Sequence, residues 1–277
     1  MMNVYVPSHA RATYANFAMG PLPRIPSEYR GVTHMVVPRG QGAIYAAELA
    51  KAELGWVRVL ETPEGMRGIG PTRHWMGQHA AEHGADKFLM MDDDIDFLIR
   101  KSPEDWALRA QTEAESLDMF RTMENYLSSV AMVGISDRAG NNRPGVGGPD
   151  HPMLVACNTR IMRMFAVRTA DWLEMEHGRV EVMEDFDLTL QLLRNGRGNV
   201  NLFYWANGQK MTNMEGGCST YRTHEVQDRA ARELQRLHGE RFVALRLKQN
   251  KTDAEGLGTR TEVTIYWKKA AASHVHD

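Results

Sequence analysis

Short strand-like runs alternate with helical segments through the first half of this 277-residue chain, and this alternation most constrains its fold. Apolar, β-branched runs predict strands at residues 32–38, 56–60, 87–91 and 131–136. Capping residues, prolines and glycines predict helices at 43–54, from Pro71 to Gly84, from Ser102 and from Thr112. Because strands alternating with helices form covered parallel sheets, we expect an α/β fold: a mostly parallel sheet with helices on both faces.

The remaining segments complete the expected domain organisation. Four prolines between residues 7 and 26 disfavour regular structure, so residues 1–30 are expected to form an irregular arm. Residues 31–277 are expected to form one domain, whose halves are 31–138 and 139–277. The second half predicts a long loop at 140–149, strands at 163–168, 199–205 and 261–267, and helices at 184–195 and 224–237.

Composition excludes several classes of protein. The apolar runs are far shorter than the roughly 20 residues of a membrane helix, so no membrane association is expected. Cys157 and Cys218 form no CxxC pair, which favours small buried packing groups in a reducing, cytoplasmic setting over zinc or redox chemistry. The formal net charge of −2 gives no general attraction to nucleic acid, although bases outnumber acids from Arg222 to Lys269.

An acidic triplet follows a strand that is expected to be buried. Asp92, Asp93 and Asp94 end the run 87–91, and ligands of open parallel sheets bind beyond the carboxyl ends of strands. Three neighbouring carboxylates repel one another, and a hard divalent cation relieves that repulsion. The triplet therefore indicates Mg²⁺ or Mn²⁺ beside a diphosphate, and the alternative is a solvated acidic turn.

Three further segments contain chemically useful groups. Glu184 and Asp185 open a helix, where a carboxylate can serve as a general base, although acids favour helix starts without any function. Arg73 shares a helix face with small residues and could reach a phosphate or simply pair with an acid. Gly216 and Gly217 allow close approach to a ligand, with a plain turn as the alternative.

In this order, the four features resemble a glycosyltransferase of the GT-A fold. The segments VMEDFDLTLQLLRNG (182–196), GGCSTYRTHE (216–225) and RTEVTIYWKKA (260–270) are similar to the phage TET/JBP-associated glycosyltransferases. That family is thought to glycosylate hydroxymethylated pyrimidines in DNA. The resemblance implies a metal-dependent transfer of a sugar from a nucleotide sugar, with a UDP-sugar favoured and Mn²⁺ or Mg²⁺ as cofactor.

The resemblance also assigns roles to individual residues. In the nucleotide-sugar half, 31–138, it implies Asp94 and Asp92 as metal ligands, Asp93 beside the ribose and Arg73 at the diphosphate. The nucleobase would be bordered by Val37, Pro38, Arg39, Glu61 and Thr62. In the acceptor half, 139–277, Asp185 matches the catalytic base, Glu184 would hold hydroxyl groups, Gly216 and Gly217 would approach the donor, and His224 would complete the metal shell.

The implied acceptor is a 5-hydroxymethylpyrimidine in DNA, flipped out of the duplex stack. The cations available for phosphate contacts are Arg138, Arg143, Arg160, Arg163, Arg222, Arg229, Arg232, Arg236, Lys268 and Lys269. Tyr221 or Trp205 could stack on the displaced base. The alternative is that these cations form a solvated face paired with Glu225, Asp228 and Glu233. No obligatory protein partner is indicated, and a phage-encoded enzyme would act in the host cytoplasm.

Other functions remain open on the sequence alone. A glycosyltransferase of this kind could act on a glycan, a protein or a small molecule instead of DNA. A two-metal nucleotidyltransferase would show a similar carboxylate cluster. An aspartyl-nucleophile phosphatase is disfavoured because its Asp-x-Asp follows the first strand, and a Ca²⁺-stabilised binding module would leave Asp185 and Arg73 without a common purpose.

Overall fold

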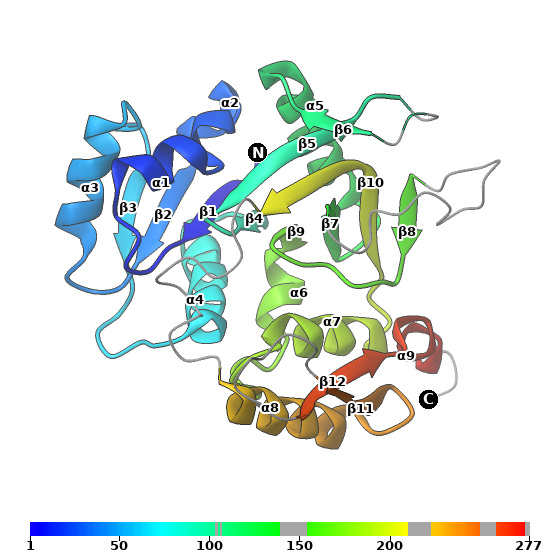
Figure 1. Cartoon of the computed structure of the whole chain (residues 1–277). Helices are drawn as coiled ribbons and strands as arrows, with labels where there is room; N and C mark the ends of the chain where they lie inside the picture. The colour runs from blue at the N-terminus through cyan, green and yellow to red at the C-terminus, as the bar shows by residue number, and fades with distance from the viewer. Residues whose placement is uncertain (103–104, 106, 139–153, 210–222, 250–258, 275–277) are drawn as a thin grey trace.

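The computed structural model describes the chain apart from residues 103–104, 106, 139–153, 210–222, 250–258 and 275–277 (Figure 1). In this described part, ten strands form one sheet in the order β3-β2-β1-β4-β9-β7-β10-β5-β6, with β8 on β10. These strands are β1 (Asn3–Pro7), β2 (Thr33–Val37), β3 (Arg58–Glu61), β4 (Lys87–Met91), β5 (Ile95–Arg100), β6 (Leu108–Ala110), β7 (Met132–Asp137), β8 (Val155–Cys157), β9 (Met164–Arg168) and β10 (Asn199–Gln209).

A second sheet pairs β11 (Val243–Gln249) with β12 (Thr259–Ile265). The helices are α1 (Tyr14–Met19), η1 (Leu22–Arg24), α2 (Ser27–Arg30), α3 (Gly42–Lys51), α4 (Ile69–Glu82), α5 (Glu113–Tyr126), α6 (Thr169–Leu173), α7 (Glu184–Arg194), α8 (His224–His238) and α9 (Trp267–Ser273). None of the helices in the described ranges combines the length and apolar composition needed to cross a membrane.

The strand directions confirm the expected α/β class. The run β3-β2-β1-β4 pairs in parallel, and β7 pairs with β10 in parallel. Between these runs lies β9, which is antiparallel to both β4 and β7. Two reversals restore the original direction, so β7 and β10 point the same way as β4. Most strands therefore end at one edge, while β9, β5 and β8 run the opposite way.

The expected irregular arm at residues 1–30 is wrong. β1 lies in the middle of the parallel run, where Val4, Tyr5 and Val6 are fully buried. Pro7 is the last residue of this strand, so the amide hydrogen that proline lacks affects only the strand end. The other prolines lie between strands, among α1, η1 and α2. Prolines here separate elements and do not prevent them.

Most of the other predicted elements are confirmed within a few residues, including the capping box between Thr112 and Glu115 at the start of α5. The helix predicted from Ser102 is wrong, because β5 and β6 form an antiparallel hairpin there. The Lys101 amide donates to the Ala107 carbonyl at 3.0 Å, which closes that hairpin. Cross-strand pairing has overridden a local helix signal.

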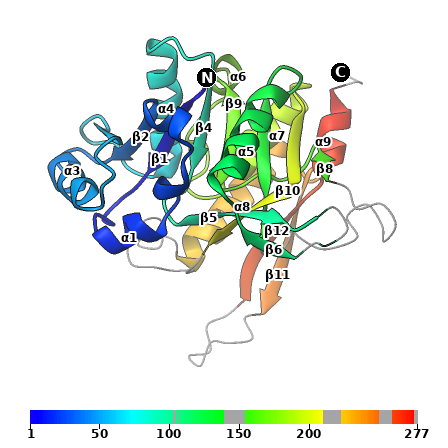
Figure 2. The same cartoon turned by 90° about the horizontal axis from the view of Figure 1, so that it is seen from above.

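Both faces of the main sheet are covered by helices (Figures 1 and 2). Side chains alternate across the sheet: Val4 and Val6 join a core that includes α3 and α5, whereas Tyr5 joins a second core with α4, α6 and α7. A third core combines α7, α8, β11 and α9. Cys157, expected to be buried, is exposed because it lies on the short outer strand β8, and Cys218 lies outside the described residues.

Candidate active site

The candidate site lies at the edge where the parallel strands β1 to β4 end. Ser8 follows β1, Pro38 follows β2, Thr62 follows β3 and Asp92 follows β4. Strands that run in parallel bring their carboxyl ends to one edge, so residues distant in sequence meet here. This edge contains the acidic triplet that the sequence singled out.

Asp93 and Asp94 lie in the tight turn between β4 and β5 and are held by residues from two other segments. The Ser8 hydroxyl donates to Asp93 at 2.5 Å, and Arg11 Nη1 lies 2.6 Å from Asp93 Oδ1 and 3.2 Å from Asp94 Oδ2. Gln209 Nε2, at the end of β10, donates to Asp94 Oδ2 at 2.8 Å. Burial raises the pKa of Asp93, against the opposing effects of Arg11 and Ser8.

Arg73 joins the acidic triplet to the start of α7. Its Nη2 lies 3.1 Å from Asp92 Oδ1, and its Nη1 lies 2.6 Å from Glu184 Oε1. Burial raises the pKa of Asp92 to about 6, although the Arg73 charge acts in the opposite direction. One buried guanidinium thus holds two carboxylates that lie 92 positions apart in the sequence.

Helix α4 positions Arg73 through a close approach at Gly77. A Cβ added at Gly77 would collide with the indole of Trp172, so only glycine fits against this ring. Trp172 also donates from Nε1 to the Arg73 carbonyl at 3.2 Å. Farther along the side chain, the guanidinium carbon lies 5.7 Å from the ring centre of Phe165. Gly77 thus lets α4 pack closely against α6.

The chain reaches α7 by a route that the sequence did not predict. β9 is antiparallel to β4, so the start of β9, and not its end, lies beside Asp92. The Asp92 amide donates to the Arg163 carbonyl at 2.8 Å. The chain then runs away from the edge, passes through α6 and returns to Glu184. Met183, at φ 67°, makes the left-handed turn into α7.

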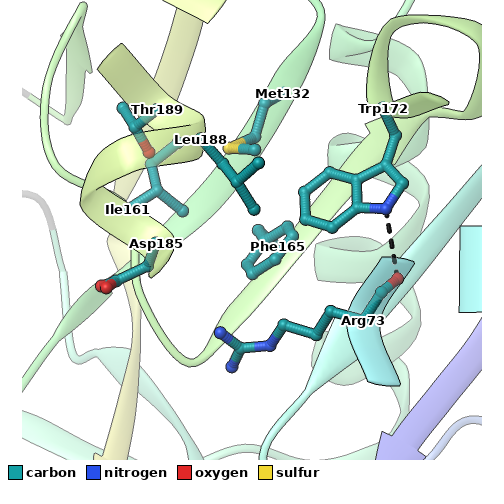
Figure 3. Close-up of a pocket in the computed structure, with 8 residues that line it drawn as sticks. All are labelled: Arg73, Met132, Ile161, Phe165, Trp172, Asp185, Leu188 and Thr189. Carbon is teal, nitrogen blue, oxygen red and sulfur yellow. Dashed lines mark hydrogen bonds between the residues drawn. The ribbon is translucent and has the colours of Figure 1, made fainter. Parts of the chain in front are cut away.

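A pocket under this edge is lined by Arg73, Met132, Ile161, Phe165, Trp172, Asp185, Leu188 and Thr189 (Figure 3). Figure 3 shows Asp185 and the Arg73 guanidinium at one end of the group, with Trp172 on the opposite side. Within the described ranges, the Asp185 carboxylate has no hydrogen bond or ion pair. A carboxylate that is not engaged by a neighbour can accept a proton from a bound hydroxyl.

Asp187, two residues farther along α7, is buried and bonded to two neighbouring side chains, so its role is structural. Its Oδ1 lies 2.5 Å from Arg179 Nη2 and 2.7 Å from Nε2 of the buried His238. Burial acts to raise the pKa of Asp187, but the hydrogen bonds from His238 and Arg179 outweigh it and the pKa is lowered. Asp187 therefore joins α7 to α8 and faces away from the pocket-lining Asp185.

The residues assigned to the nucleobase come together beside α3. The Thr62 amide donates to the Val37 carbonyl at 2.8 Å, and Glu61 Oε1 accepts from the amides of Gly40 at 3.1 Å and Gly42 at 2.7 Å. Arg39 Nε lies 3.7 Å from Glu61 Oε2, and Pro38 lies between Val37 and Arg39. These contacts build one corner of the edge, while the nucleobase role stays a prediction.

Other predicted residues lie farther from this constellation or outside the described part. His224 is exposed at the start of α8, and no described contact joins it to Asp92 or Asp94. Gly216 and Gly217 lie outside the described residues. Nowhere in the described ranges do three His, Cys, Asp or Glu residues form a group able to hold a metal. The metal role of His224 therefore stays a prediction.

The cations expected to contact DNA occupy two regions. Near the sheet edge, Arg138 is exposed, Arg160 lies 4.4 Å from the ring centre of Phe186, and Arg163 pairs with Asp137 at 2.9 Å. In the C-terminal part, Lys268 is exposed on α9, whereas Arg229, Arg232 and Arg236 pair with Glu181, Asp228 and Glu233. The alternative of a paired face is therefore confirmed for Arg232 and Arg236, with Asp228 and Glu233, whereas Arg229 pairs with Glu181 and not with Glu225. Arg143, Tyr221 and Arg222 lie outside the described residues.

Trp205 is misassigned by the sequence as a platform for a base. It is buried in the first core, packed between strands, and has no face open to a ligand. β10 is buried along almost its whole length, because it lies inside the sheet between β7 and β5, so an aromatic residue on it belongs to the core.

The sequence reasoning missed Ser8, Arg11, Tyr45, Gln209 and Asp137. The Tyr45 hydroxyl oxygen lies 2.8 Å from the Ser8 hydroxyl oxygen, and Arg11 contacts both Asp93 and Asp94. The run Val4-Tyr5-Val6 was the available signal, because β-branched and aromatic residues favour a strand. The residues that follow a strand here, Ser8 and Arg11, would then have been expected at the edge.

The geometry can be compared with known proteins. The model of the TET-associated glycosyltransferase family matches residues 2–217. The chain belongs to this family. The family drawn from the sequence is thereby confirmed, while the segment 260–270 and nearly all of 216–225 lie beyond the match; this TET-associated glycosyltransferase is an enzyme of the transferase class. No curated protein matches it.

Solved structures show weaker likeness to this TET-associated glycosyltransferase. S. aureus TarS 1-349 in complex with UDP-GlcNAc has 15% sequence identity and a TM-score of 0.47, covering 85% of this chain and 67% of that chain. A mycobacterial protein has 14% identity and a TM-score of 0.44, with coverages of 96% and 84%. A mannose-1-phosphate geranyltransferase from Thermus thermophilus has 15% identity and a TM-score of 0.37, with coverages of 61% and 58%. At these TM-scores the assignment rests on the family match.

Proposed function

We propose that the enzyme transfers a sugar from a nucleotide sugar to the hydroxyl of a 5-hydroxymethylpyrimidine in DNA, with the help of a divalent cation. The observation that carries this proposal is the Arg73 bridge between Asp92 and Glu184, with Asp185 on the same turn of α7. Binding of a phosphate, binding of a cation and removal of a proton need these three kinds of group close together. The family match supports the transferase class and, through its name, DNA as acceptor.

The chemistry of the donor set fits a hard divalent cation. Asp92 and Asp94 offer carboxylate oxygens at a strand end, and part of the Asp94 carboxylate is already bonded to Arg11 and Gln209. The described residues provide no complete cage of protein ligands. Mg²⁺ and Mn²⁺ are commonly held by one or two carboxylates with phosphate oxygens and water, so Asp92 and Asp94 would hold the cation with the donor. When bound, such a cation neutralises the charge that develops on the leaving nucleoside diphosphate.

The protein's own groups then divide the work. Arg73 is a fixed positive charge for the diphosphate, and its bonds to Asp92 and Glu184 orient the guanidinium. Asp185 takes the proton from the acceptor hydroxyl as its oxygen attacks the anomeric carbon. Glu184 is buried and paired, so it serves to hold Arg73 and the sugar hydroxyls instead of accepting that proton.

The test uses DNA duplexes that contain 5-hydroxymethylcytosine, 5-hydroxymethyluracil or only unmodified bases. Each duplex is incubated with UDP-glucose or another nucleotide sugar and Mn²⁺ or Mg²⁺, with EDTA as the metal-free control, and is then digested to nucleosides for mass spectrometry. We expect a hexose on the hydroxymethylated nucleoside only, and none with EDTA. If no donor labels DNA while a glycan, protein or small molecule is labelled, the DNA acceptor is wrong. Labelling that persists in EDTA would contradict the metal dependence.

A further inference from the structure

The antiparallel ribbon β11–β12 lies outside the segment that the family model matches. The match ends at residue 217, whereas the ribbon begins at Val243. Its register pairs Leu245 with Val263, Arg246 with Glu262 and Leu247 with Thr261. The site residues Asp92, Asp94, Arg73 and Asp185 all lie within the match. The ribbon is therefore an addition to the matched part, and the reaction chemistry does not explain it.

The two faces of the ribbon differ. Helix α8 packs against the face that carries Val243 and Val263, which join Leu234 in the third core. Thr261 on this face also hydrogen-bonds Asp228 of α8. Because side chains alternate along a strand, Arg246, Lys248 and Glu262 belong to the other face. Arg246 and Lys248 are exposed there, and this outer face of the ribbon is polar and open.

Charge distinguishes the outer face from α8. On α8 the cations Arg229, Arg232 and Arg236 are each paired with a carboxylate. On the ribbon, Lys248 pairs with Glu262 at 3.2 Å, and Arg246, which lies across from the same Glu262 in the register, has no ion pair among the described residues. A face on which two cations share one acid keeps a positive charge that attracts a polyanion, whereas cations that each have their own acid are largely neutralised. The outer face of the ribbon is thus better suited to phosphate contacts than α8.

The ribbon also projects on the side where substrate must approach. Figure 2 shows β1 and β10 running toward one side of the molecule, and the ribbon extends beyond the body on that same side. The end of β10 is tied to the acidic triplet, since Gln209 donates to Asp94. A long ligand that presents one unit at the site could therefore continue along the ribbon.

We propose that the outer face of β11–β12, with Arg246 and Lys248, docks on the DNA duplex that flanks the base at the site. The proposal rests on the proposed function, because it takes DNA as the acceptor. A two-stranded ribbon fits the major groove of B-DNA, and Arg and Lys contacts to phosphates fix register without reading sequence. The ribbon holds the duplex while the flipped nucleotide occupies the site.

The test compares the double variant Arg246→Gln/Lys248→Gln with the matched double variant Arg232→Gln/Arg236→Gln on α8. Binding to a hydroxymethylated duplex is measured at several salt concentrations, and sugar transfer is measured on the duplex and on the free hydroxymethylated nucleoside. For the ribbon variant we expect about tenfold weaker duplex binding at low salt and a salt slope smaller by roughly 2, because about 0.9 is lost per phosphate contact. Transfer to the free nucleoside and slow hydrolysis of the nucleotide sugar should be unchanged, which also verifies folding.

Three outcomes decide the proposal. A loss of duplex binding confined to the ribbon variant supports it, and Glu262→Gln should then strengthen duplex binding by removing an acid from the same face. Equal duplex binding by the ribbon variant and the wild type overturns it, while the DNA acceptor stands if the wild type still labels duplex DNA. If the wild type neither binds nor labels duplex DNA, the acceptor and the ribbon proposal fail together.

Discussion

At the scale of single residues, two acids on one turn of α7 have different roles: Asp185 is the proposed catalytic base, and Asp187 stabilises the fold. Asp185 lines the pocket without a described partner, whereas Asp187 is buried between Arg179 and His238. We expect Asp185→Asn to lower turnover by about two to four orders of magnitude, because the side chain keeps its shape but no longer accepts a proton. Donor binding and stability should remain close to those of the wild type. Turnover and calorimetric donor affinity measure the two effects.

Asp187→Asn is the matched comparison. It removes a charge from a buried pair, so we expect a loss of stability of about 3 kcal/mol or more in chemical unfolding. If Asp185→Asn instead kept more than half of the wild-type rate, another group would have to be the base.

Arg11 and Asp94 provide a second pair of variants. One guanidinium nitrogen of Arg11 lies beside both Asp93 and Asp94, where a cation would neutralise the same carboxylates. We expect Arg11→Met to bind Mn²⁺ several-fold more tightly than the wild type in the absence of donor, because the competing charge is gone. Asp94→Ala should abolish metal-dependent nucleotide-sugar binding and leave the fold intact. Calorimetry with Mn²⁺ alone and with Mn²⁺ and UDP measures both effects. If Asp94→Ala binds UDP as tightly as the wild type in the presence of Mn²⁺, Asp94 is not a metal ligand.

The sequence singled out the candidate residues Asp92, Asp94, Arg73, Glu184 and Asp185 because they fall at strand ends and helix starts, where local patterns are strong, and the structure brings Arg73 together with Asp92 and Glu184. It missed Arg11, since that residue acts through a strand that four prolines concealed. It also assigned Trp205 to the surface, because the sequence around an aromatic residue does not show whether its strand lies at the edge of the sheet or between two other strands. Contacts that depend on pairing partners are not encoded locally.

At the scale of elements, the packing of α4 against Trp172 fixes where Arg73 lies. Alanine at Gly77 would gain helix propensity but would place a methyl group against the indole. We expect Gly77→Ala to destabilise the protein by about 1–3 kcal/mol and to weaken donor binding through displacement of Arg73.

Gly31→Ala, at the end of α2, is the control at a glycine with open space around it. Gly31 has an ordinary φ of −65°, and an added Cβ would meet nothing within 4 Å. Its stability should change by less than about 0.5 kcal/mol. Thermal unfolding of both variants, together with donor titration, tests the expectation, and a Gly77→Ala protein as stable as Gly31→Ala would contradict it.

Element types followed from the sequence far better than element directions. Periodicity and caps located α4, α5 and α7 because these signals lie within each helix. The direction of β9 is a property of the sheet: the segment 163–168 reads as a strand whichever way it is inserted. The hairpin β5–β6 was missed for the same reason, since its pairing outweighs the helix-like start at Ser102.

At the scale of the whole molecule, two histidines that are shielded from water contribute to the dependence of stability on pH. Burial lowers the pKa of His34 and of His177 to about 4, below their usual value of about 6.5. Between these values the unfolded chain binds more protons, so each histidine's contribution is present above pH 6.5 and is lost as the pH falls toward 4. Each loss is at most about 3 kcal/mol. Asp92 acts oppositely, because its raised pKa penalises the folded state at neutral pH and that penalty fades below about 6.

Urea unfolding at pH 7.5 and pH 5 measures this dependence. We expect the wild type to lose stability at pH 5 and His34→Phe to lose less, since the group that takes up the proton is removed. The ring of Phe keeps the stacking on Tyr5, whose centre lies 5.1 Å from that of His34. An identical pH dependence in both proteins would show that His34 does not titrate on unfolding.

The place of β9 in the sheet also bears on how the chain is made. It lies between β4 and β7, yet the ribosome produces it after both. Until residues 164–168 emerge, β4 has one unpaired edge and β7 has no strand partner, because β10 is made later still. Open edges of this kind recruit other strands, so the nascent chain is most prone to aggregate in the interval between β7 and β9.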